Sequence, residues 1–433
     1  MNSPFHHIPT RLFSELAAGG GGREAVNALA SGQYSKNKWL LLGVLRTAIN
    51  TGHCQAPAAQ AAYNLLADVE GHDPGAVQAV ISYPSVAAWA SRTLATNTQM
   101  AGTDPGRLSA VAAAAAIRAK FPAEIEVPTT DNLAMLPSLG AAAAGGQTAL
   151  VRSASAGAEV LSAGAATCVP SDPHQDAMGW SAVRELRIGS LRMLLDDIDP
   201  FRMPAEPRVA SRLPGDEVGR WEDVLRETWQ LLTRHHPDIA EEFASAVRVF
   251  VPLSLPPEGS HTSSSSAETF GAVALSEPPD AQTLAVTLAH EVQHLKLSAV
   301  LNIVELMRPD DGLRFYAPWR DDPRPVSGLL QGAYAFIGVC KFWRRQRQLD
   351  QGAAGMGAHT EFTRWRAGTQ RVVNTLLSSR LLTSAGSEFV GGMAQTLRLW
   401  QDEAVPEEAQ VLADGLAADH LGCWEDANGP APA

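Results

Sequence analysis

The chain has 433 residues, 45% hydrophobic and 18% charged, so it is long enough for two or three packed regions and too apolar to be disordered. Its formal net charge of −12 argues against nucleic acid as a partner, because binding a phosphate backbone needs clustered lysine and arginine. We expect neither a signal peptide nor a membrane span, and four scattered cysteines without a CxxC pair favour a reducing cytoplasm.

Residues 1–122 are predicted to form an N-terminal helical bundle. The segment is rich in alanine at helical spacing and is interrupted by "GGGG" from Gly19. In "YSKNKWLLLGVLRTAI", the apolar residues that recur at helical spacing are Trp39, Leu42, Leu45 and Ile49. Their spacing predicts a helix that turns this face toward the core.

Residues 123–205 are predicted to form a short β-rich region. The stretches "EIEVP", "QTALVRSAS" and "AEVLSAG" are strand-like and separated by turn residues, which indicates a small antiparallel sheet. The following "LLDDIDPFRMP" is predicted to be a loop, because the proline after Asp199 disfavours helix there.

Residues 206–350 are predicted to be the core of the protein, followed by C-terminal helices in residues 351–433. A helix from about Trp221 to His235 precedes two strands, "AVRVFVPLSL" and "GAVALS", and then a helix from about Ala281 to Leu306. This order matches the zincin arrangement, in which an edge strand before the metal helix pairs with the bound peptide. "GAVALS" is that strand or an ordinary sheet edge. The predicted class is α+β and mostly helical.

The last of these helices carries His290-Glu291-x-x-His294. Two histidines four residues apart lie on one face of a helix and can bind one metal ion, while Glu291 can reach a metal-bound water as a general base. The alternative is two buried histidines and a surface glutamate. A polar stripe on this otherwise apolar helix favours the metal, because buried polar groups need partners. The stripe consists of Thr287, His290, Glu291, His294, Ser298, Asn302 and Glu305.

The third metal ligand is expected on the next helix, "VSGLLQGAYAFIGVCKFWRRQ". Glu305 is about 16 Å beyond His294 along a continuous helix, too far to reach the same ion. The glycines Gly328, Gly332 and Gly338 predict close approach of a neighbour. Gln331 and Tyr334 flank this small-residue face and are predicted to point at the metal site, Gln331 as a ligand and Tyr334 as a cofactor-binding residue. Further ligand candidates are His359, Glu361 and Glu388.

The loop "FYAPWRDDPRPVSG" between the two helices contains Arg320 and Arg324. A guanidinium binds a carboxylate through two parallel hydrogen bonds, so an arginine near the metal would suit a dicarboxylate co-substrate. The alternative is that these arginines pair with Asp321 or Asp322.

Several of these stretches together resemble the bacterial HExxH-motif domain family, described as 2-oxoglutarate-dependent peptide β-hydroxylases of peptide-modification gene clusters. They are "LAHEVQHLKL", "FYAPWRDDPRPVSGLLQGAYAFIGVCKFWRR", "YSKNKWLLL" and "DDIDPFR", and they span roughly Gln33 to Arg347. The resemblance implies iron(II) held by His290 and His294, with 2-oxoglutarate and oxygen at open positions and a ribosomally made peptide as substrate. It implies that Glu291 carries a proton beside the metal ligands.

With this resemblance, Arg324, helped by Arg320, is predicted to bind the distal carboxylate of 2-oxoglutarate. The residues alone leave two other readings open, because imidazole suits both zinc and iron. One is a zinc metallopeptidase-like hydrolase with Glu291 as general base. The other is a binding module whose metal site is vestigial.

Overall fold

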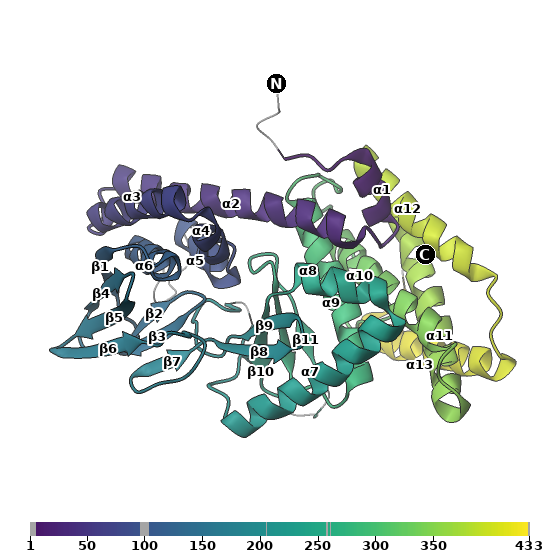
Figure 1. The fold of residues 1–433 in the computed structure, drawn as a ribbon. Coiled ribbons are helices and arrows are strands. Elements are labelled where there is room, and N and C mark those ends of the chain that lie inside the picture. The colour runs from purple at the N-terminus through teal and green to yellow at the C-terminus, as the bar shows by residue number, and fades with distance from the viewer. Residues whose placement is uncertain (1–5, 96–103, 205, 257–258, 260, 432–433) are drawn as a thin grey trace. The chain divides into compact units, whose positions relative to one another are not determined.

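The computed structural model describes residues 6–95, 104–204, 206–256, 259 and 261–431, and these residues form a mostly helical mixture of helices and sheets (Figure 1). Among them, every helix is too short or too polar to span a membrane. The α-helices are α1 (Thr10–Ala17), α2 (Gly22–Asn50), α3 (Ala56–His72), α4 (Pro74–Ile81), α5 (Pro84–Leu94), α6 (Leu108–Ala119), α7 (Gly215–His235), α8 (Pro237–Ala246), α9 (Ala281–Leu301), α10 (Val326–Gln346), α11 (Gly352–Ser378), α12 (Ser384–Gln401) and α13 (Glu407–Asn428). A 3₁₀ turn, η1 (Pro105–Arg107), precedes α6.

The strands form three small sheets, with orders β1-β4-β5-β6, β2-β3-β7 and β11-β12-β10-β9-β8. The first two are antiparallel, and in the third β10 runs parallel to β9 and β12. The strands are β1 (Ala123–Pro128), β2 (Leu133–Leu136), β3 (Gly140–Ala143), β4 (Thr148–Ala154), β5 (Gly157–Ser162), β6 (Ala165–Val169), β7 (Trp180–Ala182), β8 (Arg184–Ile188), β9 (Leu191–Leu195), β10 (Val249–Leu253), β11 (Ser263–Ser264) and β12 (Ala272–Ser276).

The chain divides into two compact units, each built from separate stretches of sequence. The histidine unit contains the chain up to Ala30, Asp223–Ala246 and Pro278–Ala433. The sheet unit contains Ser31–Glu222 and Val247–Glu277, and therefore all three sheets. The units thus join segments from more than one of the four regions expected from the sequence.

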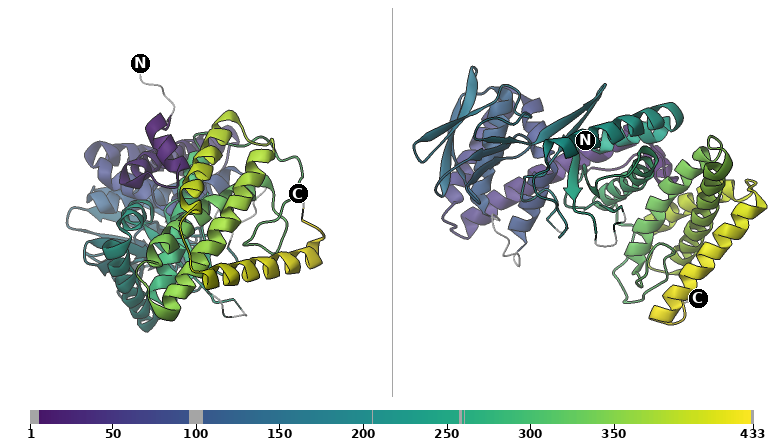
Figure 2. Two further views of the ribbon diagram at one scale, coloured as in Figure 1. Left: turned by 90° about the vertical axis from the view of Figure 1, so that its right-hand side faces the viewer. Right: turned by 90° about the horizontal axis from the view of Figure 1, so that it is seen from below.

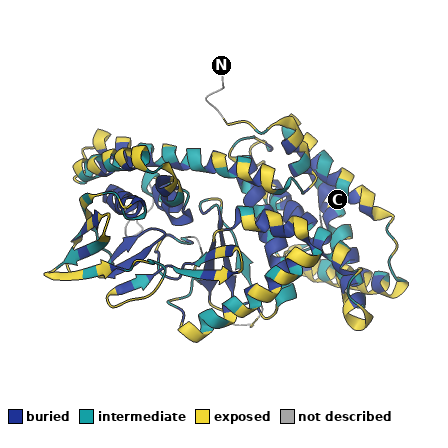
Figure 3. Ribbon diagram, viewed as in Figure 1, coloured by how far each residue is buried: buried dark blue, intermediate teal, exposed yellow. Residues whose placement is uncertain are grey.

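The sheet unit is centred on α6, which is buried on almost every side (Figure 3). Its run of five alanines, Ala112 to Ala116, lets α3, α4, β1 and β2 approach its axis closely. The predicted core face of α2 is wrong by about one residue. Trp39 and Ile49 are 69% and 49% exposed. The buried face of that segment consists of Leu41, Val44, Leu45 and Ala48.

Strand β12, predicted from "GAVALS", is an internal strand. It lies between β10, with which it pairs in parallel, and the two-residue β11, which pairs antiparallel with Leu275 and Ala274. The expectation of an edge strand is therefore wrong over these residues, because the serine-rich loop supplies a further strand. All five residues of β12 are buried.

In the histidine unit, α9 packs against α8 and α10, and α10 packs against α11 (Figure 1). Figure 2 shows α11, α12 and α13 from two further sides, with α12 and α13 both packed on α11. Helix α9 begins at an Asp280 side chain that accepts a hydrogen bond from the backbone N–H of Thr283. It ends at Leu301, earlier than predicted, so Asn302 and Glu305 lie beyond the helix and are exposed.

The glycine turn between α1 and α2 fixes α9 from one side. Lys296 Nζ donates to the Gly20 carbonyl at 2.9 Å, and Gln293 donates to the Gly19 carbonyl at 2.9 Å. Lys296 also forms a buried salt bridge of 2.8 Å with Glu242 on α8. Gly19 has a φ of +78°, a backbone conformation that favours glycine.

Candidate metal centre

His290 and His294 lie one turn apart on α9, and their imidazoles converge. The two Nε2 atoms are 3.0 Å apart, and the rings meet at an interplanar angle of 75°. Two nitrogens bonded to one ion at about 2.1 Å are about 3.0–3.4 Å apart for bond angles of about 90–109°. The pair therefore has the separation that a shared metal ion requires.

The electrostatics of the pair favour a neutral His290. Burial lowers the pKa of His290 from its usual value to about 4, with His294 adding to the lowering and the Glu291 carboxylate opposing it. A neutral imidazole offers a lone pair, which metal binding needs. Glu291 is only 2% exposed, which excludes the alternative of a surface glutamate beside two histidines.

Gln331 lies on the opposite side of the His294 ring from the Nε2 pair. Its Oε1 atom accepts a hydrogen bond from His294 Nδ1 at 3.1 Å. This hydrogen bond keeps the proton on Nδ1 and directs the Nε2 lone pair toward His290, as in many metal sites. Gln331 was predicted to be a metal ligand, and in the structure its side-chain oxygen is instead hydrogen-bonded to the His294 ring.

An aromatic wall, defined as Trp319, Phe336 and Trp365, borders His290. The Phe336 ring packs edge-on against His290 at 5.3 Å, stacks on Trp319 at 4.5 Å and contacts Trp365 at 4.5 Å. The wall residues are partly buried. Sequence analysis did not identify them. The available signal was Gly332, one turn before Phe336, where an added Cβ would lie 2.4 Å from the Trp319 indole nitrogen.

Arg320 and Arg324 share one carboxylate. Arg320 Nε donates to Asp322 at 2.8 Å, and Arg324 Nη1 donates to Asp322 at 2.9 Å. Partial burial of Asp322 acts to raise its pKa, but the hydrogen bonds from Arg324 and Arg320 outweigh it and hold this pKa below its usual value. The loop therefore has the arginine–aspartate pairing that sequence analysis had left as the alternative to a ligand site.

Tyr334 points away from the histidine pair. Its hydroxyl donates to the Leu16 carbonyl at 2.7 Å, and its ring packs on Phe389. The other ligand candidates also lie elsewhere. His359 is 3.4 Å from an Arg347 nitrogen, Glu361 accepts a hydrogen bond from Trp365, and Glu388 is exposed.

The donor set in the described part of the chain is therefore two imidazoles. Within residues 6–95, 104–204, 206–256, 259 and 261–431, no three His, Cys, Asp or Glu side chains are grouped to hold a metal ion. Two convergent imidazole nitrogens fit an ion whose remaining positions are taken by small molecules. No model of a known protein family matches the chain, and no curated protein matches it.

Proposed function

We propose that the chain is a metal-dependent enzyme in which His290 and His294 hold one ion. We further propose that this ion is iron(II), and that the reaction hydroxylates a side-chain β-carbon of a ribosomally made peptide. The 3.0 Å separation of the two Nε2 atoms is the observation that carries the metal site. The choice of iron and 2-oxoglutarate rests on the resemblance in the HExxH and APWR segments.

Bound iron(II) would supply the oxidation, in which oxygen and 2-oxoglutarate give the hydroxylated peptide, succinate and carbon dioxide. In this proposal Gln331 holds the His294 ring in its binding orientation. Phe336 covers one side of His290 and limits access of water. Glu291 carries a proton next to the ligands.

Arg324 is proposed to bind the distal carboxylate of 2-oxoglutarate, with help from Arg320. Arg324 lies against the first turn of α10, where a Cβ on Gly328 would be 3.0 Å from its Nε. Gln331 follows Gly328 by one turn of the same helix, so this arginine is close to the residue that contacts His294.

A second candidate is a zincin-like hydrolase with Glu291 as general base. The burial of Glu291 and the effect of its charge on the pKa of His290 support it, because a general base must lie close to a metal-bound water. Anaerobic reconstitution with iron(II) or zinc separates the two functions. In the oxygenase, adding 2-oxoglutarate to the iron protein should give a visible charge-transfer band, and oxygen should then release succinate. Cleavage of a casein substrate by the zinc protein without oxygen would instead support the hydrolase.

The first prediction concerns the ligands themselves. His290→Ala and His294→Ala should each abolish stoichiometric metal binding, because each removes one of two imidazoles. Metal content after desalting, measured by inductively coupled plasma mass spectrometry, tests this directly. His359→Ala is the matched control, since this histidine lies on α11 beside Arg347 and its loss should leave metal content unchanged. Full metal occupancy in either variant of the pair would refute the site.

A further inference from the structure

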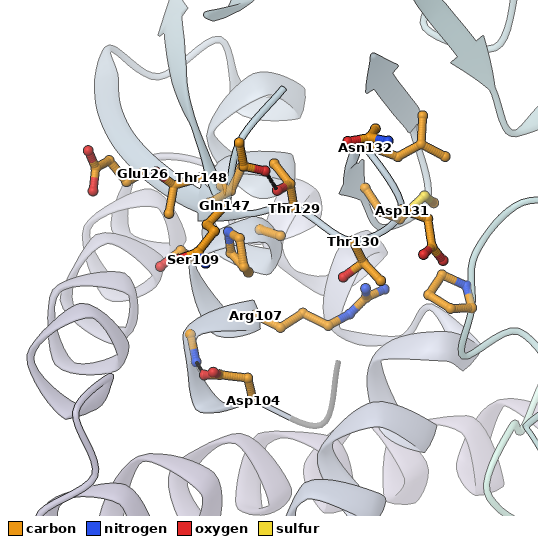
Figure 4. A pocket seen from close by; sticks show the side chains of 18 of the residues that line it. Asp104, Arg107, Ser109, Glu126, Thr129, Thr130, Asp131, Asn132, Gln147 and Thr148 are labelled. Carbon is orange, nitrogen blue, oxygen red and sulfur yellow. Dashed lines mark hydrogen bonds between the residues drawn. The ribbon is translucent and has the colours of Figure 1, made fainter. Parts of the chain in front are cut away.

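The sheet unit contains a cavity of about 600 Å³ between η1 and the turn that joins β1 to β2 (Figure 4). Its acidic side chains, Asp104, Glu126 and Asp131, lie on different walls and do not converge on one point. The arginine in the lining, Arg107, is already paired with Asp199 at 2.9 Å. The described lining residues therefore include no group of charged side chains arranged around a ligand.

In the histidine unit, the connection from α9 to α10 contains a closed segment, residues 315–324, which we call the Arg324 loop. Its two ends are joined, because the Phe315 N–H donates to the Arg324 carbonyl at 2.8 Å and the Arg324 N–H donates to the Phe315 carbonyl at 2.9 Å. The loop carries Trp319, which stacks on Phe336 in the aromatic wall beside His290. A shift of this loop as a body would therefore move Trp319 and Arg324 together.

Helix α13 holds the Arg324 loop at two points. The Tyr316 side chain is only 7% exposed, and its hydroxyl lies 2.9 Å from Nδ1 of His420. Asn428, the last residue of α13, donates from Nδ2 to the Asp321 carbonyl at 2.8 Å. Between them, the Trp424 ring packs edge-on against Tyr316, with ring centroids 5.3 Å apart. Three residues at intervals of one turn thus direct one face of α13 toward the loop.

The hydrogen bond between Tyr316 and His420 has a defined direction. Nε2 of His420 faces the Asp321 carboxylate at 3.8 Å, which favours the proton on that nitrogen. Nδ1 then has a free lone pair and accepts from the Tyr316 hydroxyl. Burial lowers the pKa of His420, Asp321 opposes this change and Arg364 adds to it. The ring is therefore neutral, and an acceptor at Nδ1, at neutral pH.

The other neighbours of the Arg324 loop contact it by packing. A Cβ on Gly332 of α10 would lie 2.4 Å from the Trp319 indole nitrogen, and a Cβ on Gly368 of α11 would lie 3.2 Å from Pro318. The Arg371 guanidinium lies 4.9 Å from the centre of the Tyr316 ring. Within the described part of the chain, the hydrogen bonds that join the loop to another element are the two from α13.

We propose that α13 is a positioning element of the candidate metal centre, in which His420, acting through Tyr316, holds the Arg324 loop against α10. His420 follows Tyr316 by 104 positions, so the C-terminal helix contributes to the centre through a long-range contact with its loop. The inference rests on the proposed function in one respect, since Arg324 is taken as the anchor for the 2-oxoglutarate carboxylate. The position of the loop itself can be measured without that co-substrate.

Hydrogen–deuterium exchange of the full chain tests how the loop is held. Tyr316→Phe and His420→Ala each remove the hydrogen bond, so the loop amides should exchange about three- to tenfold faster, while those of α9 keep the rate of the parent. His420→Asn places a side-chain acceptor at about the position of Nδ1 and should restore the slow exchange. Asp419→Ala, at an exposed neighbouring position of α13, is the matched control. Unchanged loop exchange in Tyr316→Phe and His420→Ala, or equal loss in His420→Asn and His420→Ala, overturns the proposal.

The affinity for 2-oxoglutarate separates a positioning role from a purely structural one. In the anaerobic iron(II) protein, Tyr316→Phe and His420→Ala should bind 2-oxoglutarate about three- to tenfold more weakly and keep the metal content of the parent. The double variant should lose little more than His420→Ala alone, because both substitutions remove the same hydrogen bond. Parent affinity in a variant whose loop exchanges faster overturns the positioning role. If the parent itself binds no 2-oxoglutarate, the proposed function fails, and loop exchange with its rescue by His420→Asn decides the inference alone.

Discussion

Asp322 determines how the proposed 2-oxoglutarate anchor can be tested. Its carboxylate accepts hydrogen bonds from Arg320 and Arg324, so a carboxylate of the co-substrate must compete with it. These side chains are partly exposed, and exposed ion pairs contribute only about 0–1 kcal/mol. Replacing the Asp322 carboxylate with that of the co-substrate therefore costs little free energy.

The second prediction uses this competition. Arg324→Lys keeps the charge but loses the planar fork, so the apparent affinity for 2-oxoglutarate should fall about tenfold. Asp322→Asn should raise the affinity, because it removes the competing carboxylate. Titration of the charge-transfer band of the iron protein measures both. Unchanged affinity in Arg324→Lys and Arg320→Lys would place the anchor elsewhere, with Arg308 and Arg314 as the next candidates.

A third prediction concerns Asp196, which is fully buried in the sheet unit. Burial, together with the nearby charge of Asp199, raises the pKa of Asp196 to about 6, although Tyr83 donates a hydrogen bond to it. The folded state then binds more protons than the unfolded state between about pH 4 and 6. The free energy of unfolding should therefore fall as the pH rises through this window.

Urea denaturation at several pH values checks this prediction. Relative to Asp196→Asn, the parent should lose stability from about pH 4 to 6 and change little above that window. Tyr83→Phe removes a hydroxyl that favours the ionised carboxylate, so it should extend the loss to higher pH. Parallel pH profiles for the parent and Asp196→Asn would contradict the argument.

At the scale of elements, Gly338 sets the distance between α9 and α10. A Cβ at this position would lie 2.3 Å from the backbone oxygen of Ala289, the residue before His290. Helix α9 therefore rests on the backbone of α10, and the three glycines predicted to permit close approach do so. Gly332 faces Trp319, and Gly328 faces Arg324.

The fourth prediction follows from that contact. Gly338→Ala gains about 1 kcal/mol of helix propensity, but the backbone clash should outweigh it and lower the free energy of unfolding by about 1–3 kcal/mol. Because α9 must shift next to His290, metal affinity should fall too. Gly357→Ala on α11 is the matched control, since nothing lies within 4 Å of its Cβ, and it should stabilise the protein by up to about 1 kcal/mol. Equal stability of the parent and Gly338→Ala would contradict the packing.

Helix α10 shows what local sequence determines. Pro325 before it and periodic apolar residues within it predict the bounds Val326–Gln346 that the structure has. The face of α2 was predicted less well, because Leu40, Leu41 and Leu42 are consecutive and several registers are equally apolar. Only the tertiary partners decide that Leu41 is buried and Trp39 is not. The internal position of β12 depends on pairing with β11, which its own sequence does not encode.

In the candidate site, too, the sequence predicts some features and not others. The spacing of His290 and His294 predicts their convergence, because helix geometry alone brings them together. The role of Gln331 depends on the rotation of α10 about its own axis, which glycine contacts with α9 set. The contact between Trp319 and Phe336 joins a loop to a helix, so no spacing rule in the sequence predicts it.

At the scale of the molecule, the proposed metal site belongs to a single unit. His290 and His294 lie in the histidine unit, whereas all three sheets lie in the sheet unit. The sheet unit contains its own continuous hydrophobic core, from Leu41 to Ala274. A unit with its own core can unfold as a cooperative transition of its own.

The fifth prediction is that a bound metal ion stabilises the histidine unit alone. A ligand present at about 100 times its Kd stabilises the state it binds by about 2.7 kcal/mol, which raises the melting temperature of a medium-sized unit by about 5–10 °C. In scanning calorimetry, zinc or anaerobic iron(II) should move the transition of the histidine unit and leave that of the sheet unit in place. His294→Ala should remove this shift, because it removes one of the two imidazoles. A single transition that the metal ion moves as a whole would contradict independent unfolding, because both units would then melt as one cooperative structure.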